Sequence, residues 1–214
     1  MTALITGMTA CNSPYEVVAL ANDVFPNNDA IHIPINSCSS YSSKPLTFTY
    51  GELIQRIDLV SAAWEESLVK GPVALILENR VDFFIHWLGL NKLGICVVPI
   101  SAELQDEEIR YQLEHSNVRT LLCLEEHLER LSLMSAKLVA PVSCLSTDTL
   151  TPSDASVVKE PKLVGLDDEC AILYTSGSTG KPKGCILSNE YFIQQGVWYA
   201  SQGGYMNLRQ GRER

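Results

Sequence analysis

Short apolar runs alternate with helical patterns through the middle of the chain, and this alternation limits the fold more than any other feature. Three continuous runs predict strands buried on both faces of a sheet. They are Val73–Leu77, Cys96–Ile100 and Arg119–Leu124. The segments between and after them, which begin at Val81, Asp106 and Glu125, have the periodicity of helices. In the first of these helices we expect Phe84, Trp87 and Leu88 to point inward. Strands that alternate with such helices form β-α-β units, so we expect an α/β fold with a largely parallel sheet and flanking helices.

The N-terminal third predicts two further helices and a hairpin. A capping sequence with Pro14 at the first helical position indicates a helix over residues 14–24. Alternating isoleucines over 31–35, interrupted by Pro34, predict an edge strand, and Leu46–Thr49 provides its return strand. A second capping sequence at Thr49–Glu52 starts a helix whose apolar face includes Trp64, which we place in the core.

Composition and charge exclude several classes of function. The chain has 16 Lys and Arg against 25 Asp and Glu, a net charge of −9, which argues against binding nucleic acid or an anionic membrane. No apolar run approaches the roughly 20 residues of a membrane span. The N-terminus has no early positive charge and is a poor signal peptide.

The cysteines and histidines lack the spacing of a metal site. The 7 cysteines are dispersed without a C-x-x-C pair, and the 4 histidines include no H-x-x-x-H pair, so we expect no metal bound by His or Cys. Free thiols in this pattern indicate a reducing, cytoplasmic location. His86, His115 and His127 lie on predicted helices, where we expect structural or solvated side chains.

A glycine-, hydroxyl- and lysine-rich stretch lies between two apolar runs near the C-terminal end. It combines Thr175, Ser176, Gly177, Ser178, Thr179, Gly180, Lys181, Lys183 and Gly184. Glycine lets successive N–H groups turn inward to form an anion-binding concavity, and hydroxyls and ammonium groups add to the attraction for phosphate. A Walker motif needs Ser or Thr after Gly-Lys, but Pro182 follows Lys181. The alternative is a glycine-rich surface hairpin with no binding function. Two lysines and four hydroxyls in one short turn favour a polyphosphate site instead.

The remaining segments suggest a division of the chain into three parts. Residues 137–166 are weakly patterned, with a strand-like run over 138–145 followed by a polar stretch. A helix is expected over residues 190–205. We therefore predict an N-terminal α/β lobe over residues 1–145, a linker over 146–168, and the phosphate-loop hairpin with its following helix over 169–214.

The stretch Thr175–Gly184 closely resembles the phosphate-loop signature of the adenylate-forming superfamily, Thr-Ser-Gly-(Ser/Thr)-Thr-Gly-x-Pro-Lys-Gly. Every fixed position of the signature is filled. The resemblance extends over residues 29–214 through motifs that form scaffold in that family. These are Thr49–Leu53, Glu78–Arg80 with Phe83–Leu90, and Asn91–Ile100. The resemblance implies the N-terminal lobe of the adenylate-forming enzyme fold, ending shortly after the phosphate loop.

The resemblance also implies a reaction and its participants. An AMP-forming acyl-CoA ligase joins a carboxylic acid to ATP to give an acyl-adenylate, and then transfers the acyl group to coenzyme A. Thr175, Ser176, Gly177, Ser178, Thr179 and Gly180 would cradle the β- and γ-phosphates, and Lys183 would pair with them as the catalytic residue. Lys181 occupies a variable position. No residue here corresponds to the family's Mg²⁺ carboxylate, ribose aspartate or C-terminal lysine, so the chain alone is expected to be an inactive N-terminal fragment whose partner is the rest of the enzyme.

The sequence departs from the family pattern and leaves alternatives open. Asn189 follows Ser188 where the family usually has a histidine, and Gly71-Pro72 replaces Gly-Asp before the Val73 strand. One alternative is a non-catalytic nucleotide-binding or interaction module derived from the same fold. Another is a structural α/β domain with a vestigial loop. We also expect the chain alone to expose an apolar sheet edge and to associate.

Overall fold

The computed structural model describes residues 6–67, 70–150, 163–176 and 180–202. Its strands are β1 (Asp29–Ile33), β2 (Leu46–Thr49), β3 (Val73–Ile76), β4 (Val97–Pro99), β5 (Thr120–Cys123), β6 (Ser143–Ser146), β7 (Glu169–Thr175) and β8 (Lys183–Ser188). Its helices are α2 (Pro14–Val24), α3 (Ile35–Cys38), α4 (Tyr50–Glu66), α5 (Val81–Lys92), α6 (Asp106–His115), α7 (Glu125–Ser135) and α8 (Asn189–Ser201).

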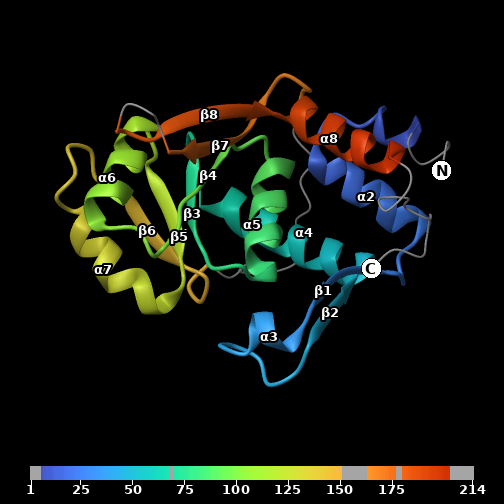
Figure 1. Cartoon of the computed structure of the whole chain (residues 1–214), viewed down its shortest axis with the longest axis horizontal. Helices are drawn as coiled ribbons and strands as arrows, with labels where there is room; N and C mark the ends of the chain where they lie inside the picture. The colour runs from blue at the N-terminus through green and yellow to red at the C-terminus, as the bar shows by residue number, and fades with distance from the viewer. Residues whose placement is uncertain (1–5, 68–69, 151–162, 177–179, 203–214) are drawn as a thin grey trace.

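Six strands form one sheet, in the order β6-β5-β3-β4-β7-β8. The pairs β6-β5, β5-β3, β3-β4 and β4-β7 are parallel, and only β8 runs antiparallel, to β7. The predicted α/β class with a largely parallel sheet is therefore confirmed. In Figure 1 the strands β3 to β6 lie between α6 and α7 on one side and α4 and α5 on the other.

Alternate residues of the central strands supply two separate cores, as expected for a sheet covered on both faces. One core joins Ala74 and Ile76 of β3 to Ile109 of α6 and Leu131 of α7. The other core has a different set of side chains: Val73 and Leu75 of β3, Leu90 of α5 and the fully buried Trp64 of α4. The prediction that Trp64 lies in the core is confirmed.

The β1–β2 hairpin forms a two-stranded antiparallel sheet of its own. Its Phe48 packs with Ile57 of α4 and Ile85 of α5. The predicted strand over 31–35 was placed too far along, because β1 ends at Ile33 and Pro34 is the N-cap of the short helix α3. Proline fixes its own φ and has no N–H for the ladder, so the strand stops there.

The helix starts follow the capping sequences. Thr49 and Glu52 make both hydrogen bonds of a capping box at the start of α4. Ser13 accepts a hydrogen bond from the Glu16 N–H at the start of α2, whereas the Glu16 carboxylate accepts from Asn12 N–H at 2.6 Å. Helix α8 follows the expected segment as far as Ser201, and the part of the prediction from residue 203 onward lies outside the described residues.

Two local expectations were wrong. The strand expected over 138–145 is β6, Ser143–Ser146, because Leu138 and Val142 fill the core from irregular backbone instead. Phe84, expected to point inward from α5, is 45% exposed. Helix α5 buries Ile85 and Leu88, and Phe84 lies beside that face, where it packs its ring edge-on against Phe83.

A buried amide network joins segments that are far apart in the sequence. Asn91 of α5 donates from Nδ2 to Asn189 Oδ1 at 2.8 Å and accepts from the Tyr15 N–H at 3.0 Å. Asn189 in turn donates from Nδ2 to the Gly165 carbonyl at 2.8 Å, and its side chain is 1% exposed. The residue that departs from the family pattern therefore connects α5, α8 and the segment before β7.

We expect Asn189→Ala to lower the free energy of unfolding by about 1–3 kcal/mol, because the buried Asn91 amide loses its hydrogen bond to Asn189 and keeps only the weaker contact of its Nδ2 with Cys170 Sγ at 3.5 Å. Urea unfolding followed by circular dichroism measures the change. Glu190→Ala is the matched control, since Glu190 is exposed in the same helical turn. Equal midpoints for the two variants would contradict the role assigned to the network.

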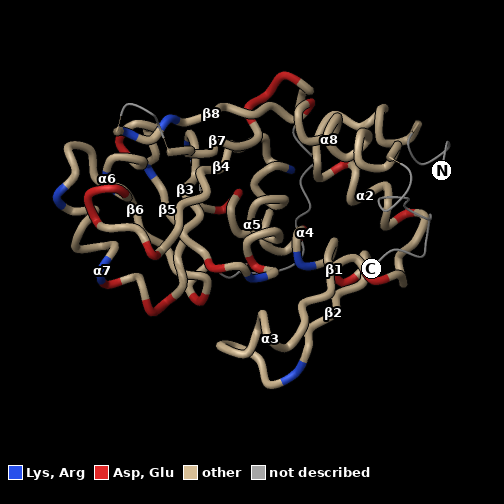
Figure 2. Tube along the Cα trace, in the orientation of Figure 1, with Lys and Arg blue, Asp and Glu red and all other residues tan. Residues whose placement is uncertain are grey.

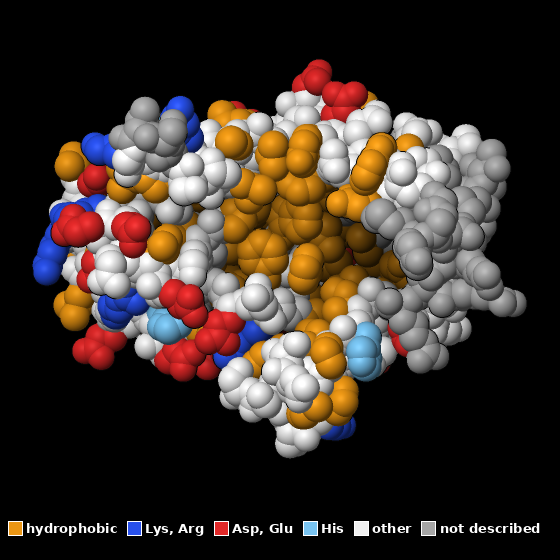
Figure 3. All heavy atoms as spheres, in the orientation of Figure 1, with side chains coloured by type: hydrophobic (Ala, Val, Ile, Leu, Met, Phe, Trp, Pro, Cys, Tyr) orange, Lys and Arg blue, Asp and Glu red, His pale blue; other side chains and the backbone are white. Residues whose placement is uncertain are grey.

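Strand β8 lies at the edge of the sheet, and Ile186 on it is 60% exposed. Figure 3 also shows hydrophobic side chains gathered in a hollow in the middle of one face of the molecule. An unpaired strand edge with apolar side chains favours association with another chain. Among the described residues, no helix has the length and apolarity that crossing a membrane requires.

We expect the 214-residue chain to associate reversibly as its concentration rises, and Ile186→Lys to weaken this association. Sedimentation velocity over a range of concentrations tests both statements. Leu133→Lys is the control, because Leu133 is a 63% exposed side chain on α7, away from β8. A wild-type chain that stays monomeric at every concentration would contradict the expectation.

Candidate functional site

The described residues on either side of the phosphate-loop turn, 175–176 and 180–184, lie at the end of the β7–β8 hairpin, as the flanking apolar runs predict. Because β7 is parallel to β4, its last residues lie at the same edge of the sheet as the carboxyl ends of β3, β4 and β5. Ligands of α/β proteins bind preferentially at this edge. The hairpin therefore carries its hydroxyl and lysine side chains to the edge of the sheet where a ligand site is expected.

Two of the predicted site residues are brought together at the last strand pair before the turn. Thr175 of β7 lies directly opposite Lys183 of β8 in the antiparallel register. Side chains of directly opposed residues lie on the same face of a hairpin, so the Thr175 hydroxyl and the Lys183 ammonium share one face. Both residues, and Ser176 after them, are exposed.

Gly180 has a backbone conformation that explains the choice of glycine. Its φ is +89°, in the region that favours glycine, and a Cβ placed there would meet no atom within 4 Å. The requirement is therefore conformational and not one of space. Gly177, Ser178 and Thr179 lie outside the described residues, so their part in the phosphate cradle stays a prediction from the sequence.

The last glycine of the signature has a packing role that the sequence did not reveal. Gly184 lies opposite Tyr174 in the hairpin register. A Cβ on Gly184 would come within 3.0 Å of Ile172 Cγ2 and 3.2 Å of Tyr174 Cζ. The glycine therefore leaves room for the Tyr174 ring to lie across β8.

Helix α6 contacts β7 and the residue that precedes β8, both close to the turn. The Tyr174 hydroxyl donates to the Gln112 carbonyl at 3.3 Å and lies 2.8 Å from His115 Nδ1. Immediately before β8, the Pro182 carbonyl accepts a hydrogen bond from the Tyr111 hydroxyl at 3.0 Å. Burial raises the pKa of Tyr174 above its ordinary value, so its hydroxyl stays protonated and able to donate.

The charge at the hairpin end is positive, although the molecule as a whole is acidic. From Ala171 to Asn189 the only charged side chains are those of Lys181 and Lys183, and Figure 2 shows basic residues at the end of β8 close to α6. Lys181 Nζ lies 5.6 Å from the centre of the Tyr111 ring, a cation–π distance. The stretch offers phosphate a positive charge but supplies no carboxylate for Mg²⁺.

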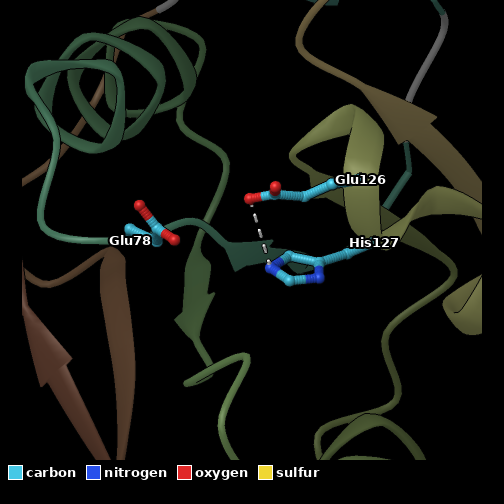
Figure 4. Close-up of side chains that lie close together, drawn as sticks. All are labelled: Glu78, Glu126 and His127. Carbon is cyan, nitrogen blue, oxygen red and sulfur yellow. Dashed lines mark ion pairs between the residues drawn. The ribbon is translucent and has the colours of Figure 1, made fainter. Parts of the chain in front are cut away.

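A second group of polar side chains follows β3 and β5 at the same edge of the sheet. Glu78, Glu126 and His127 each have one side-chain atom that could bind a metal ion, and these three atoms lie within 4.8 Å of one another (Figure 4). The spacing of metal ligands along the sequence does not indicate this group, because Glu78 is far from the other two residues. Glu78 is also paired with Arg80 at 3.1 Å, and both glutamates are exposed, so the group is a surface ion cluster.

The space next to this cluster is a cavity of about 1000 Å³. Its lining includes Glu78 and His127, together with the apolar side chains Phe83, Phe84 and Ile100. Phe84, although exposed, is therefore one of the side chains that line this cavity.

The histidines have three different surroundings. His86 is buried and accepts a hydrogen bond at Nδ1 from Trp64 Nε1 at 3.2 Å. Burial lowers its pKa to about 4, so His86 is neutral at physiological pH. His115 stacks on Tyr111 beneath the hairpin, and His127 belongs to the ion cluster. The expected structural role is clearest for His86.

The fold and the hairpin define the class of protein, and comparison with known proteins agrees. The family model described as AMP-binding enzyme matches residues 22–211. The chain belongs to this family of adenylate-forming enzymes.

Relatives within the family carry different names and differ greatly in length. The chain is 27% identical over 186 residues to 4-coumarate–CoA ligase 3 of Arabidopsis thaliana, a match that covers 76% of this chain and 33% of that protein. It is 30% identical over 162 residues to tyrocidine synthase 3 of Brevibacillus parabrevis, covering 74% of this chain and 2% of that protein. The chain thus spans about a third or less of the length of these relatives.

Solved structures support the same fold. The fatty acid AMP ligase from Legionella pneumophila superposes with a TM-score of 0.76 at 19% identity, covering 91% of this chain and 33% of that chain. At this identity the likeness establishes the fold alone. The expected membership of the adenylate-forming superfamily and the expected N-terminal lobe of its fold are therefore confirmed.

Proposed function

We propose that the chain is the phosphate-binding N-terminal part of an AMP-forming acid–thiol ligase, which activates a carboxylic acid as its acyl-adenylate and transfers it to coenzyme A. The observation that carries the proposal is the hairpin itself. Those of its signature residues that the structure describes lie at the carboxyl edge of a parallel sheet, with Thr175 and Lys183 on one face and Gly180 at positive φ. No nucleic acid and no membrane span are part of the proposal.

In the proposed reaction, a carboxylate oxygen of the acid attacks the α-phosphorus of ATP, and the bond to the β-phosphate oxygen breaks to release pyrophosphate. Charge then develops on the departing β- and γ-phosphates. Lys183 would neutralise that charge as the catalytic residue, while Thr175, Ser176, Gly177, Ser178, Thr179 and Gly180 would hold the phosphates through N–H and hydroxyl groups. In the second step the thiol of coenzyme A loses its proton to water and its sulfur attacks the acyl carbon. The bond between that carbon and the phosphate oxygen then breaks, and AMP leaves.

Mg²⁺ would shield the phosphate charges when ATP is bound. The described residues at the end of the hairpin, 171–176 and 180–188, contain no carboxylate that could hold it. The remaining part of the enzyme, as the partner that completes the site, would supply that group together with the contacts to ribose and to the acyl chain.

A cytoplasmic location agrees with the state of the thiols. All seven cysteines are free. Burial raises the pKa of Cys96, Cys123 and Cys170 to about 12, so these thiols are unreactive core side chains. An interior with several unpaired thiols is typical of proteins from a reducing compartment.

Carboxylate-dependent exchange of labelled pyrophosphate into ATP tests the proposed reaction. The protein is the chain together with whatever coding sequence follows Arg214 in its gene, supplied with a panel of aliphatic and aromatic acids, and with coenzyme A for thioester formation. We expect exchange with at least one acid. ATP binding without exchange for any acid would replace the ligase by the nucleotide-binding module, and absence of both would support a structural domain.

A further inference from the structure

The hairpin packs against α6 through three aromatic rings, two on α6 and one on β7. None of the three occupies a fixed position of the phosphate-loop signature. Tyr111 and His115, four residues apart on one face of α6, stack at 5.4 Å between ring centres. Tyr174 of β7 meets both rings edge-on, at 6.4 Å from Tyr111 and 5.7 Å from His115. We call Tyr111, His115 and Tyr174 the ring platform.

The ring platform is tied to each side of the turn by a separate hydrogen bond. On the β7 side, Tyr174 precedes Thr175 and is held by the Gln112 carbonyl and by His115. On the β8 side, the Tyr111 hydroxyl holds the Pro182 carbonyl, one residue before Lys183. The two residues that the proposed function places against phosphate, Thr175 and Lys183, are therefore each adjacent to a position fixed by α6.

Helix α6 is itself a rigid support. Ile109 and Leu113, on its inner side, are fully buried in the core against β3 and β5. The Gln112 carbonyl also accepts hydrogen bonds from the Ser116 N–H at 3.0 Å and the Ser116 hydroxyl at 2.6 Å. A group whose support is held by core packing keeps its position more closely than one held on a loop alone.

We propose that Tyr111 is a positioning residue for the phosphate site: its hydroxyl fixes the Pro182 carbonyl and thereby sets the place of Lys183 relative to Thr175. The ring of Tyr111 also attracts the Lys181 ammonium, so Lys181 lies on the platform and Lys183 remains the charge available to phosphate. This inference rests on the proposed function for the identity of the ligand. The arrangement of the hairpin on α6 does not depend on it.

Tyr111→Phe tests the proposal because it removes the hydroxyl and keeps the ring. Hydrogen–deuterium exchange of peptides covering residues 171–188 measures the order of the hairpin without any ligand. We expect exchange at the hairpin end to rise about threefold to tenfold, the effect of losing one hydrogen bond. Tyr191→Phe is the matched control, since Tyr191 is an exposed tyrosine on α8. Unchanged exchange in Tyr111→Phe would overturn the platform.

Binding of inorganic tripolyphosphate, measured by calorimetry with the same chains, tests whether the ordered hairpin is needed to bind phosphate. We expect Tyr111→Phe to raise the dissociation constant about threefold to tenfold while lowering the midpoint of thermal unfolding by only about 2–4 °C, and Tyr191→Phe to change neither. The ³¹P signal of the bound terminal phosphate should also shift in Tyr111→Phe, which a purely structural role would not cause.

The outcomes separate this inference from the proposed function. An unchanged dissociation constant in Tyr111→Phe, in a wild-type chain that binds tripolyphosphate, would overturn the positioning role and leave the phosphate site intact. A wild-type chain that binds no tripolyphosphate would overturn the phosphate site, and with it any role of Tyr111 in positioning Lys183 for phosphate.

Discussion

Replacing Lys183 with alanine is expected to weaken ATP use by about 1.5–3 kcal/mol, the range for one charge-assisted hydrogen bond. This corresponds to roughly a tenfold to hundredfold loss in ATP affinity for the chain, or in ATP-dependent turnover for a longer enzyme. Lys183 lies opposite Thr175 at the hairpin end and is exposed, so its removal leaves no cavity in the core. Folding should be unaffected, and a titration with ATP measures the loss directly.

Two lysine controls sharpen this prediction. Lys181→Ala removes the same charge from the same hairpin, but Lys181 is associated with the Tyr111 ring, so we expect a smaller effect, of about threefold or less. Lys137→Ala removes an exposed charge after α7 and should change nothing. Equal affinities for wild type and Lys183→Ala would remove Lys183 from the site. Equal losses for Lys181→Ala and Lys183→Ala would reduce its role to general attraction of anions.

Acidification is expected to destabilise the fold through His86. The folded state holds the pKa of His86 at about 4, below the ordinary value of 6.5, because burial disfavours the charged imidazole. Between these pH values the unfolded chain binds the proton and the folded chain does not, so stability is complete above pH 6.5 and is lost as the pH falls towards 4. The contribution of His86 over this window is about 3 kcal/mol.

The matched variant for this prediction is His86→Gln, which keeps an acceptor for Trp64 Nε1 but does not titrate. Urea unfolding at several values between about pH 4 and 7 gives the two stability profiles. Carboxylates such as Glu52, whose pKa is lowered by its hydrogen bonds to Thr49, add a slope at low pH that both proteins share. The wild type should lose more stability than His86→Gln as the pH falls. Parallel profiles would show that His86 does not carry the effect.

Sequence patterns predicted most of the fold because they report local structure and burial directly. The apolar runs at Val73 and Arg119 are strands of a sheet covered on both faces, and the capping box at Thr49 starts α4 where expected. Phe84 was misplaced because helical periodicity distinguishes a buried face from a polar one, but does not show that the edge of an apolar face lines a cavity.

The sequence predicted which residues of the candidate site could bind phosphate, but not which residues hold the hairpin in place. The glycine, hydroxyl and lysine pattern identified the turn, and the register places Thr175 opposite Lys183. Tyr111 and His115 could not be identified, because their contacts with Tyr174 and Pro182 depend on how α6 packs beside the hairpin. The division into an N-terminal lobe, a linker and a hairpin unit stays a prediction, although β7 and β8 join the same sheet as β3 to β6.

The central claim is that the end of the β7–β8 hairpin binds the outer phosphates of ATP. Calorimetric titration of the chain with ATP, inorganic tripolyphosphate and adenosine, with each phosphate ligand also tested as a competitor of the other, measures this most directly. We predict that ATP and tripolyphosphate bind and compete, that adenosine does not displace tripolyphosphate, and that Lys183→Ala weakens binding of both phosphate ligands. Absence of tripolyphosphate binding, or ATP binding that tripolyphosphate does not displace, would contradict the claim.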